Sequence, residues 1–299
     1  MADTSGKRVV LVISRPLCEP ALHNRVMPMM KLLLEQGHAI ALVCPRHADN
    51  RKCAPQDVEL KEVAVADIGE RNFIKRAWKE TLDSLKLLKR ARSTSADLYL
   101  LTIPSMFLTF LAPLVLAGRK AVLDVRDLTW EYLSETQLLQ RGSKRMFRML
   151  FCCSLPFFRA VSVTNPTEMD YVARYWRRSP PPLLVSNGIA RERFNSLTDL
   201  AATTEQWTVT YMGNVGLGQR LDTLIRAAER LPQVQFVIVG SGVDFERIVQ
   251  LVTKKGLSNV RLTGRVTWEG LRRFYSATNV LYAQLTQDYA GAVPSKLYE

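Results

Sequence analysis

The stretch Tyr211-Met-Gly-Asn-Val-Gly-Leu-Gly218 decides the fold that we expect for this chain. It ends a short apolar run, 208–212, which predicts a β-strand, and precedes an amphipathic run, 221–230, which predicts a helix. Glycines between a strand and a helix let backbone amides approach a phosphate at the helix N-terminus. The stretch therefore predicts a parallel α/β unit with an anion site. The alternative is that its glycines only turn the chain.

The same alternation of strands and helices runs along the whole chain, as in a parallel sheet with crossover helices. Further strands after this stretch are predicted at 235–239, 260–262 and 279–283, with helices over 245–255 and 268–277. The strands predicted before it are 9–13, 40–44, 59–65, 98–101, 121–125, 160–164 and 183–185. The clearest early helix has apolar residues at the helical spacing and ends at Gly37; they are Leu22, Val26, Met29, Leu33 and Leu34.

Length and patterning predict two domains, because 299 residues exceed one ordinary domain. Hydrophobic patterning lapses over 191–206, so we expect an N-terminal domain over 1–200 and a C-terminal domain over 201–299. The second half has four predicted strands against seven in the first. Pro294 and Ser295 begin a helix of about one turn before Glu299, and so short a helix is not stable alone. We therefore expect a C-terminally truncated second domain.

Charge and composition exclude several functions. The chain has 41 Lys and Arg against 28 Asp and Glu, a net charge of +13, which predicts an anionic partner. No nucleic-acid motif accompanies this charge. The three dispersed histidines and five cysteines without a CxxC pair indicate no metal site, and no GxGxxG follows the first strand. The apolar run 107–118 is too short to span a membrane, and no secretion signal precedes it.

Two more glycine turns accompany the first. Val239-Gly240-Ser241-Gly242 ends the next predicted strand, and Leu262-Thr-Gly264-Arg-Val266 ends the one after it. All three turns follow parallel strands, so we expect them at one carboxyl edge, where open α/β sheets bind ligands.

These segments together resemble glycosyltransferase family 4. The resemblance lies in the order and spacing of YMGNVGLGQRLDTLIRAAERL, FVIVGSG, LSNVRLTGRV, ATNVLYAQL and PSKLYE, and in LDVRDLTWE, VSVTNPTEMDYV and SNGI in the first half. It covers about residues 9–299 and is closest to bacterial enzymes that build O-antigen and capsule polysaccharides. The resemblance implies a GT-B fold, in which two Rossmann-like domains of doubly wound parallel sheets face a cleft.

The function that the resemblance implies is retaining sugar transfer without a metal or other cofactor. The donor would be a UDP-sugar held by the C-terminal domain. The acceptor would be a polyprenyl-diphosphate-linked glycan held by the N-terminal domain, in cell-surface polysaccharide synthesis. The alternative is an inactive, truncated glycosyltransferase-like protein that binds a partner or a membrane.

The resemblance also implies donor-binding residues in the glycine turns. Gly213 and Asn214 match the loop that faces the donor diphosphate, and Gly240 and Gly242 belong to the second turn on the same edge. Gln219 and Arg220 stand where many members carry Lys-Gly, so Arg220 would replace the missing lysine charge. The alternative is a solvated Arg220.

Three further donor positions lie near the C-terminus. Val266 matches the segment beside the nucleobase, although it could equally be core, and Glu299 matches the acid that accepts hydrogen bonds from the ribose. Gly291 stands where the first acid of the family would fall. Lys296 is then the candidate cation near the phosphates, or else a solvated lysine at the start of a helix.

Catalytic candidates lie after the strand 121–125. Arg126 and Asp127 stand where many relatives carry His-Asp near the reacting sugar. Asp127 and Glu131 are four residues apart, so both carboxylates could reach the cleft if a helix starts there, or they could cap that helix. Arg25, after the first strand, is a candidate for diphosphate contact, and polarity at a helix start explains it equally well.

Two basic segments of the first half combine cations with apolar residues. Eight bases lie in 70–92, and five bases without an acid lie in 141–159. Basic amphipathic helices of this kind can lie on anionic lipid, so we expect peripheral docking on the cytoplasmic face of the inner membrane. The alternative is a solvated helix face over ordinary packing.

Overall fold

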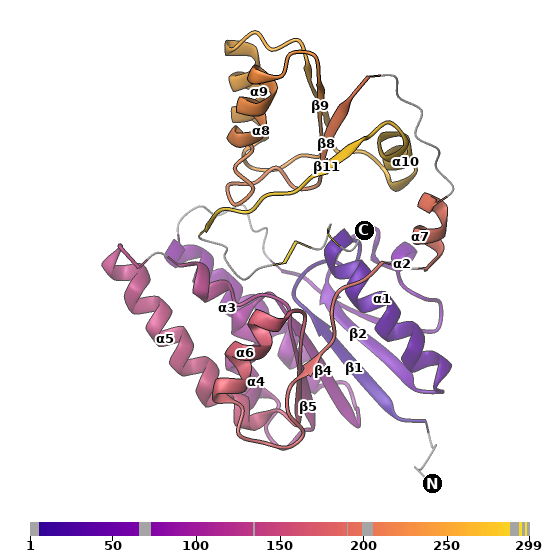
Figure 1. Cartoon of the computed structure of the whole chain (residues 1–299). Coiled ribbons are helices and arrows are strands. Elements are labelled where there is room, and N and C mark those ends of the chain that lie inside the picture. The colour runs from indigo at the N-terminus through magenta and orange to yellow at the C-terminus, as the bar shows by residue number, and fades with distance from the viewer. Residues whose placement is uncertain are drawn as a thin grey trace. The chain divides into compact units, whose positions relative to one another are not determined.

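The computed structural model describes residues 6–65, 73–133, 135–189, 191–198, 206–287, 293–294 and 297. The chain divides into two compact units, Met1–Gly188 and Ile189–Glu299 (Figure 1). Each unit is built on its own parallel sheet.

The first unit contains a parallel sheet of seven described strands in the order β3-β2-β1-β4-β5-β6-β7. Across the sheet the strand numbers fall from β3 to β1 and then rise from β4 to β7, so the order of connection reverses between β1 and β4. Doubly wound folds that bind nucleotides have the same reversal. The strands are β1 Arg8–Ile13, β2 Ala39–Pro45, β3 Glu59–Val63, β4 Leu98–Ile103, β5 Ala121–Val125, β6 Ala160–Val163 and β7 Leu183–Leu184.

Helices cover both faces of this sheet, which is why its strands are apolar on both sides. Alternate residues of β1 enter two separate cores: Val9, Leu11 and Ile13 pack against α1, and Val10 and Val12 belong to the core of the other face. That second core includes residues of α3, α4, α5 and α6. The helices and short turns are α1 Pro20–Glu35, α2 Asn50–Cys53, α3 Phe73–Arg92, α4 Met106–Val115, η1 Thr129–Tyr132, α5 Leu138–Ser154, η2 Leu155–Phe157 and α6 Pro166–Tyr175.

The second unit contains a parallel sheet of four described strands in the order β10-β9-β8-β11. This arrangement is the same as that of β3-β2-β1-β4 in the first unit. The order of connection therefore reverses between β8 and β11. The elements are α7 Arg191–Thr198, β8 Thr208–Met212, α8 Asp222–Arg230, β9 Gln235–Val239, α9 Phe245–Lys254, β10 Val260–Gly264, α10 Trp268–Ser276 and β11 Val280–Tyr282. Its core joins β8 and β9 to α8 and α9.

The eleven predicted strands are confirmed, and their ends agree to within two residues. After Asp127, where the sequence left open whether a helix starts, the structure has a short 3₁₀ turn, η1. Within the described residues, no helix has the length and apolar character needed to cross a bilayer.

Candidate functional site

A hollow of about 460 Å³ lies at the carboxyl edge of the second sheet. It lies where β8 and β11 are neighbours, which is the point where the strand order reverses and where open α/β sheets bind ligands. Two hydrogen bonds join its sides: the backbone Thr286 N donates to Gly218 O over 2.8 Å, and the side-chain Nε2 of Gln284 donates to Arg220 O over 3.4 Å. Its lining residues are Arg220, Asp222, Thr223, Arg226, Gln284, Leu285, Thr286 and Gln287.

The lining of this hollow suits an anion with several oxygens. Arg220 and Arg226 supply guanidinium groups, and Thr223 lies in the first turn of α8, where the helix dipole favours negative charge. The Oγ1 atom of Thr286 is buried and has no hydrogen-bond partner in the described part of the chain. The hollow therefore combines cations with a buried polar atom that lacks a partner.

Arg220 has an unusual backbone conformation, with φ of +40°. Residues with a Cβ rarely adopt this left-handed region, and glycine adopts it freely. Glycine at this position would carry no such strain. The strained backbone directs the Arg220 side chain to a hollow that glycine would leave without this charge, and strain of this kind is often found at functional sites.

The first two glycine turns interlock. Gly213 N donates to Val239 O over 2.8 Å, and Val215 N donates to Ser241 O over 3.0 Å. The approach is so close that a Cβ on Gly240 would lie 1.9 Å from Gly213 O. The turns of Gly213, Gly240 and Gly264 do share the carboxyl edge of the sheet, since Gly240 N donates to Gly264 O over 2.8 Å.

These contacts change the role of the glycines. We expected their amides to bind phosphate, but the amides of Gly213 and Gly240 already donate to carbonyl oxygens of neighbouring turns. Their hydrogen bonds join the turns and leave these amides unavailable to an anion in this conformation. The positive charge at this edge that remains available to an anion therefore comes from side chains, with Arg220 and Arg226 at the hollow.

Asn214 and Gln219 stabilise the first turn. Gln219 Oε1 accepts a hydrogen bond from Gly216 N over 3.1 Å, and the Asn214 carbonyl oxygen accepts one from the Tyr211 hydroxyl. The Asn214 side chain packs so closely on Gly242 that a Cβ there would lie 2.6 Å from Asn214 Oδ1. Gly242 is therefore required by the packing of the turns.

Arg247 connects the beginnings of α8 and α9. Its guanidinium binds the Asp222 carboxylate over 2.8 and 2.7 Å and the Asp244 carboxylate over 2.7 Å. The hydrogen bonds from Arg247 lower the pKa of Asp222, so this acid beside the hollow is charged and paired. Arg247 thus offsets the negative charge that Asp222 would otherwise place beside a bound anion.

The remaining donor candidates are less informative. Val266 is half-buried in the segment between β10 and α10, outside the lining of the hollow. Lys296 and Glu299 lie outside the described residues, as does Gly291.

In the first unit, a buried ion pair lies at the carboxyl edge of the sheet. Arg25 on α1 binds Asp124 on β5 through Nη2 over 2.6 Å and Nε over 3.2 Å, and its Nη1 donates to Val185 O and Ser186 O. Thr102 and Ser162 donate to the same carboxylate over 3.0 and 2.7 Å. Arg25, which the sequence left open as a candidate for diphosphate contact, is therefore engaged with its own unit.

Arg126 and Asp127 follow β5 directly. Arg126 Nη2 donates to Ala21 O over 3.0 Å, and its buried Nε has no partner among the described residues. Burial raises the pKa of the Asp127 carboxyl, although Arg126 and a hydrogen bond from Tyr132 act in the opposite direction. Two more buried oxygens without a described partner, Ser14 Oγ and Asn187 Oδ1, follow β1 and β7 at this edge.

Glu131 does not share the surroundings of Asp127. Its carboxylate accepts hydrogen bonds from Arg148 Nε over 2.7 Å and from the Tyr171 hydroxyl over 2.8 Å. Burial alone would raise the pKa of Glu131, but these hydrogen bonds lower it overall. The acid that we expected to reach the reacting sugar is therefore held by α5 and α6, where its effect is structural.

Glu168 is a titratable residue that our sequence analysis missed. It is 3% exposed, and its carboxylate accepts from Thr164 N over 2.9 Å and Thr164 Oγ1 over 2.8 Å. Burial raises its pKa to about 7, and the negative charges of Asp127 and Asp124 act in the same direction. An acid three residues after Asn165 at a helix start is the sequence signal that could have identified it.

The described residues hold no group of three or more His, Cys, Asp or Glu side chains placed to bind a metal ion.

Comparison with known proteins defines the class. Residues 193–298 match the family described as glycosyl transferases group 1. A search of curated protein sequences found no significant match. The family match indicates a glycosyltransferase, and its residues coincide closely with the second unit.

Solved structures show the same fold at low identity. Sucrose-phosphate synthase from Thermosynechococcus elongatus has a TM-score of 0.68 and 17% identity over 94% of this chain and 77% of its own. WaaG, a glycosyltransferase involved in lipopolysaccharide biosynthesis, has a TM-score of 0.67 and 14% identity over 95% of this chain and 76% of its own. Anabaena HepE in complex with UDP-glucose has a TM-score of 0.64 and 14% identity, with coverages of 93% and 74%. The chain therefore has the α/β fold of GT-B glycosyltransferases.

Proposed function

We propose that this protein is a retaining glycosyltransferase of family 4. It moves a sugar from a UDP-sugar to a polyprenyl-diphosphate-linked glycan in the synthesis of a cell-surface polysaccharide of the O-antigen or capsule type. The observation that carries the proposal is the hollow between β8 and β11, with Arg220, Arg226 and the first turn of α8 at its wall.

The UDP part of the donor is supported by charge. A nucleoside diphosphate brings negative charge that Arg220 and Arg226 can bind, and Arg247 already pairs the nearby Asp222. HepE, which has the same fold, was solved with UDP-glucose bound.

The mechanism that follows is electrostatic. The acceptor hydroxyl oxygen forms a bond to the anomeric carbon and gives its proton to a carboxylate, while the bond from that carbon to the diphosphate oxygen breaks and its electron pair stays on the diphosphate. Arg220 stabilises this developing charge where it forms. Asp127 is the acid of the first unit that we assign to the reacting sugar, because its raised pKa suits a group that accepts a proton.

Docking on an anionic membrane is the second part of the proposal. A lipid-linked acceptor stays in the bilayer, so the enzyme has to approach it from the surface. On α3, Ile74, Trp78 and Leu82 are 64%, 65% and 39% exposed at a spacing of four residues, and α3 is rich in lysine and arginine. An apolar stripe beside cations fits an interfacial helix on the cytoplasmic face.

Titration calorimetry with UDP tests the donor site. We expect saturable binding to the full chain and at least ten-fold weaker binding by Arg220→Gln, because a charge-assisted contact is lost. Arg230→Gln is the matched control, since Arg230 lies at the opposite end of α8. Transfer from radiolabelled UDP-sugars to a polyprenyl-diphosphate glycan then tests the reaction. An absence of UDP binding would support the alternative of a glycosyltransferase-like binding protein without a working donor site.

A further inference from the structure

Helix α5 carries four cations and no acid. Arg141, Lys144, Arg145 and Arg148 lie on this helix and, together with Glu135 just before it, line a hollow of about 120 Å³. A water molecule occupies about 30 Å³ in the liquid, so the hollow has room for one phosphate group with some water.

The acids around this hollow balance half of its positive charge. Lys144 Nζ lies 3.0 Å from Glu135 Oε1 and 3.6 Å from Glu131 Oε2, and Arg148 pairs with Glu131. Arg141 and Arg145 make no ion pair within the described residues. Two positive charges at one hollow are therefore left for an anion from outside.

The Glu135 carboxylate lies at Lys144 where an anion from outside the protein could bind instead. The Glu135 side chain is 70% exposed, whereas that of Lys144 is 10% exposed. Water can solvate an exposed carboxylate, so Glu135 can turn outward, and Lys144 then keeps only the longer contact of 3.6 Å with Glu131 and has room for a second anionic partner.

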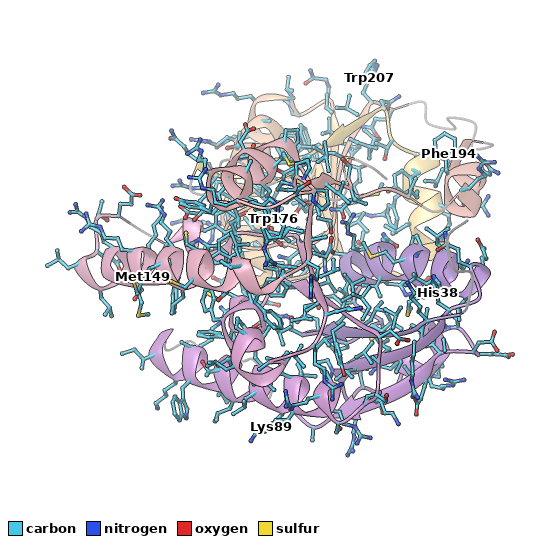
Figure 2. The ribbon with its side chains drawn as sticks, turned by 90° about the horizontal axis from the view of Figure 1, so that it is seen from below. His38, Lys89, Met149, Trp176, Phe194 and Trp207 are labelled. Carbon is cyan, nitrogen blue, oxygen red and sulfur yellow. The ribbon has the colours of Figure 1, made fainter. Side chains whose placement is uncertain are left out.

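Apolar side chains flank the two unpaired arginines on the same helix. Leu138 and Met149 are 86% and 59% exposed. With Arg141 and Arg145 between them, they follow the spacing i, i+3, i+7 and i+11, which forms one stripe along a helix. Figure 2 shows α5 with Met149 labelled and its side chains extending outward. A partner for this stripe must offer an anion and an apolar layer together.

We infer that the α5 hollow binds the phosphate of an anionic lipid headgroup, while Leu138 and Met149 enter the boundary of the acyl chains. This inference rests on the membrane docking proposed above and not on sugar transfer. Arg141, Arg145 and Lys144 hold the phosphate oxygens, and Arg148 stays with Glu131. A soluble phosphate would gain nothing from the exposed apolar residues beside the hollow.

Vesicle co-sedimentation of the full chain tests this site. Phosphatidylcholine vesicles with added phosphatidylglycerol should bind the wild type, and phosphatidylcholine alone should bind it weakly. Arg141→Gln/Arg145→Gln removes two surface cations, so its partition to the anionic vesicles should fall about thirty-fold. The exposed pair Arg272→Gln/Arg273→Gln on α10 removes the same charge from the second unit and should sediment like the wild type.

Two further measurements distinguish the sources of phosphate. Leu138→Ser/Met149→Ser should sediment less with anionic vesicles, and calorimetry with inorganic phosphate should show no saturable binding to the wild type. Circular dichroism checks that each variant is folded. Wild-type sedimentation of Arg141→Gln/Arg145→Gln overturns the inference, and so does saturable phosphate binding combined with unchanged sedimentation of Leu138→Ser/Met149→Ser. UDP binding measured on the same samples tests the proposed donor site separately.

Discussion

Arg25 Nη2 lies 2.6 Å from Asp124 Oδ1, and the two side chains are 3% and 0% exposed. The pair connects α1 to β5, and the same guanidinium holds the carbonyl oxygens of Val185 and Ser186 after β7. Thr102 on β4 and Ser162 on β6 also donate to Asp124, so five parts of the chain meet at one buried charge pair. The pair organises the carboxyl edge on which Arg126 and Asp127 lie.

Arg25→Met should destabilise the first unit by about 3–5 kcal/mol, because it leaves the Asp124 charge buried without its partner. Urea denaturation measures the loss. Glu59→Gln is the control: it breaks the ion pair of Arg8 and Glu59, in which both side chains are 44% exposed, and should cost less than about 1 kcal/mol. Equal losses in the two variants would contradict the structural role of the buried pair.

Glu168 should make the stability of the first unit depend on pH. Its pKa is raised by burial to about 7 in the folded chain, against 4.5 for the free side chain. Between these values the folded state keeps a proton that the unfolded state releases. The contribution of Glu168 to the free energy of unfolding is therefore complete below about pH 4.5 and is lost as the pH rises through about 7. The loss from this group is on the order of 3 kcal/mol.

Glu168→Gln should remove most of this dependence, because the amide carries no charge at any of these pH values. Urea denaturation at pH values between 5 and 8, about one pH unit apart, measures this dependence. Asp170→Asn, on the exposed side of the same helix, should leave the dependence as in the wild type. A Glu168→Gln profile as steep as that of the wild type would assign the dependence to another group.

Asp127 and Glu131 should respond differently to loss of charge. Glu131→Gln weakens the contacts with Arg148 and Tyr171, so we expect a stability loss of about 1–3 kcal/mol and a turnover rate close to that of the wild type in the cold. Asp127→Asn should instead lower kcat, with a smaller change in melting temperature. Thermal melts and transfer rates of both variants separate the roles. A Glu131→Gln variant that is stable but inactive would instead indicate that Glu131 acts at the reacting centre.

The sequence was sufficient for the strands because their signals are local. Short apolar runs between turn residues fix β1, β8 and β9 without knowledge of their neighbours. It was also sufficient to place Gly213, Gly240 and Gly264 on one edge, since the carboxyl ends of parallel strands coincide.

The chemistry of the edge depends on contacts between distant residues, and no local pattern shows them. Whether the Gly213 amide is free depends on Val239, twenty-six residues away. Arg25 remained an open candidate for a ligand contact because its partner, Asp124, lies ninety-nine residues along the chain. Arg226 was missed because it stands in an ordinary helix, and it becomes notable only beside the segment that follows β11.

Arg220 combines backbone strain with a candidate role in binding, so two substitutions at this position should separate the effects. Arg220→Gly and Arg220→Ala both remove the guanidinium, and both should weaken UDP binding by a similar factor. Because the backbone φ is +40°, only glycine relieves the strain, and Arg220→Gly should be more stable than Arg220→Ala by about 1 kcal/mol. Thermal unfolding and UDP calorimetry on the two proteins provide the measurements. If both variants bind UDP like the wild type while glycine still stabilises the fold, Arg220 does not bind the donor. The hollow is then not the donor site.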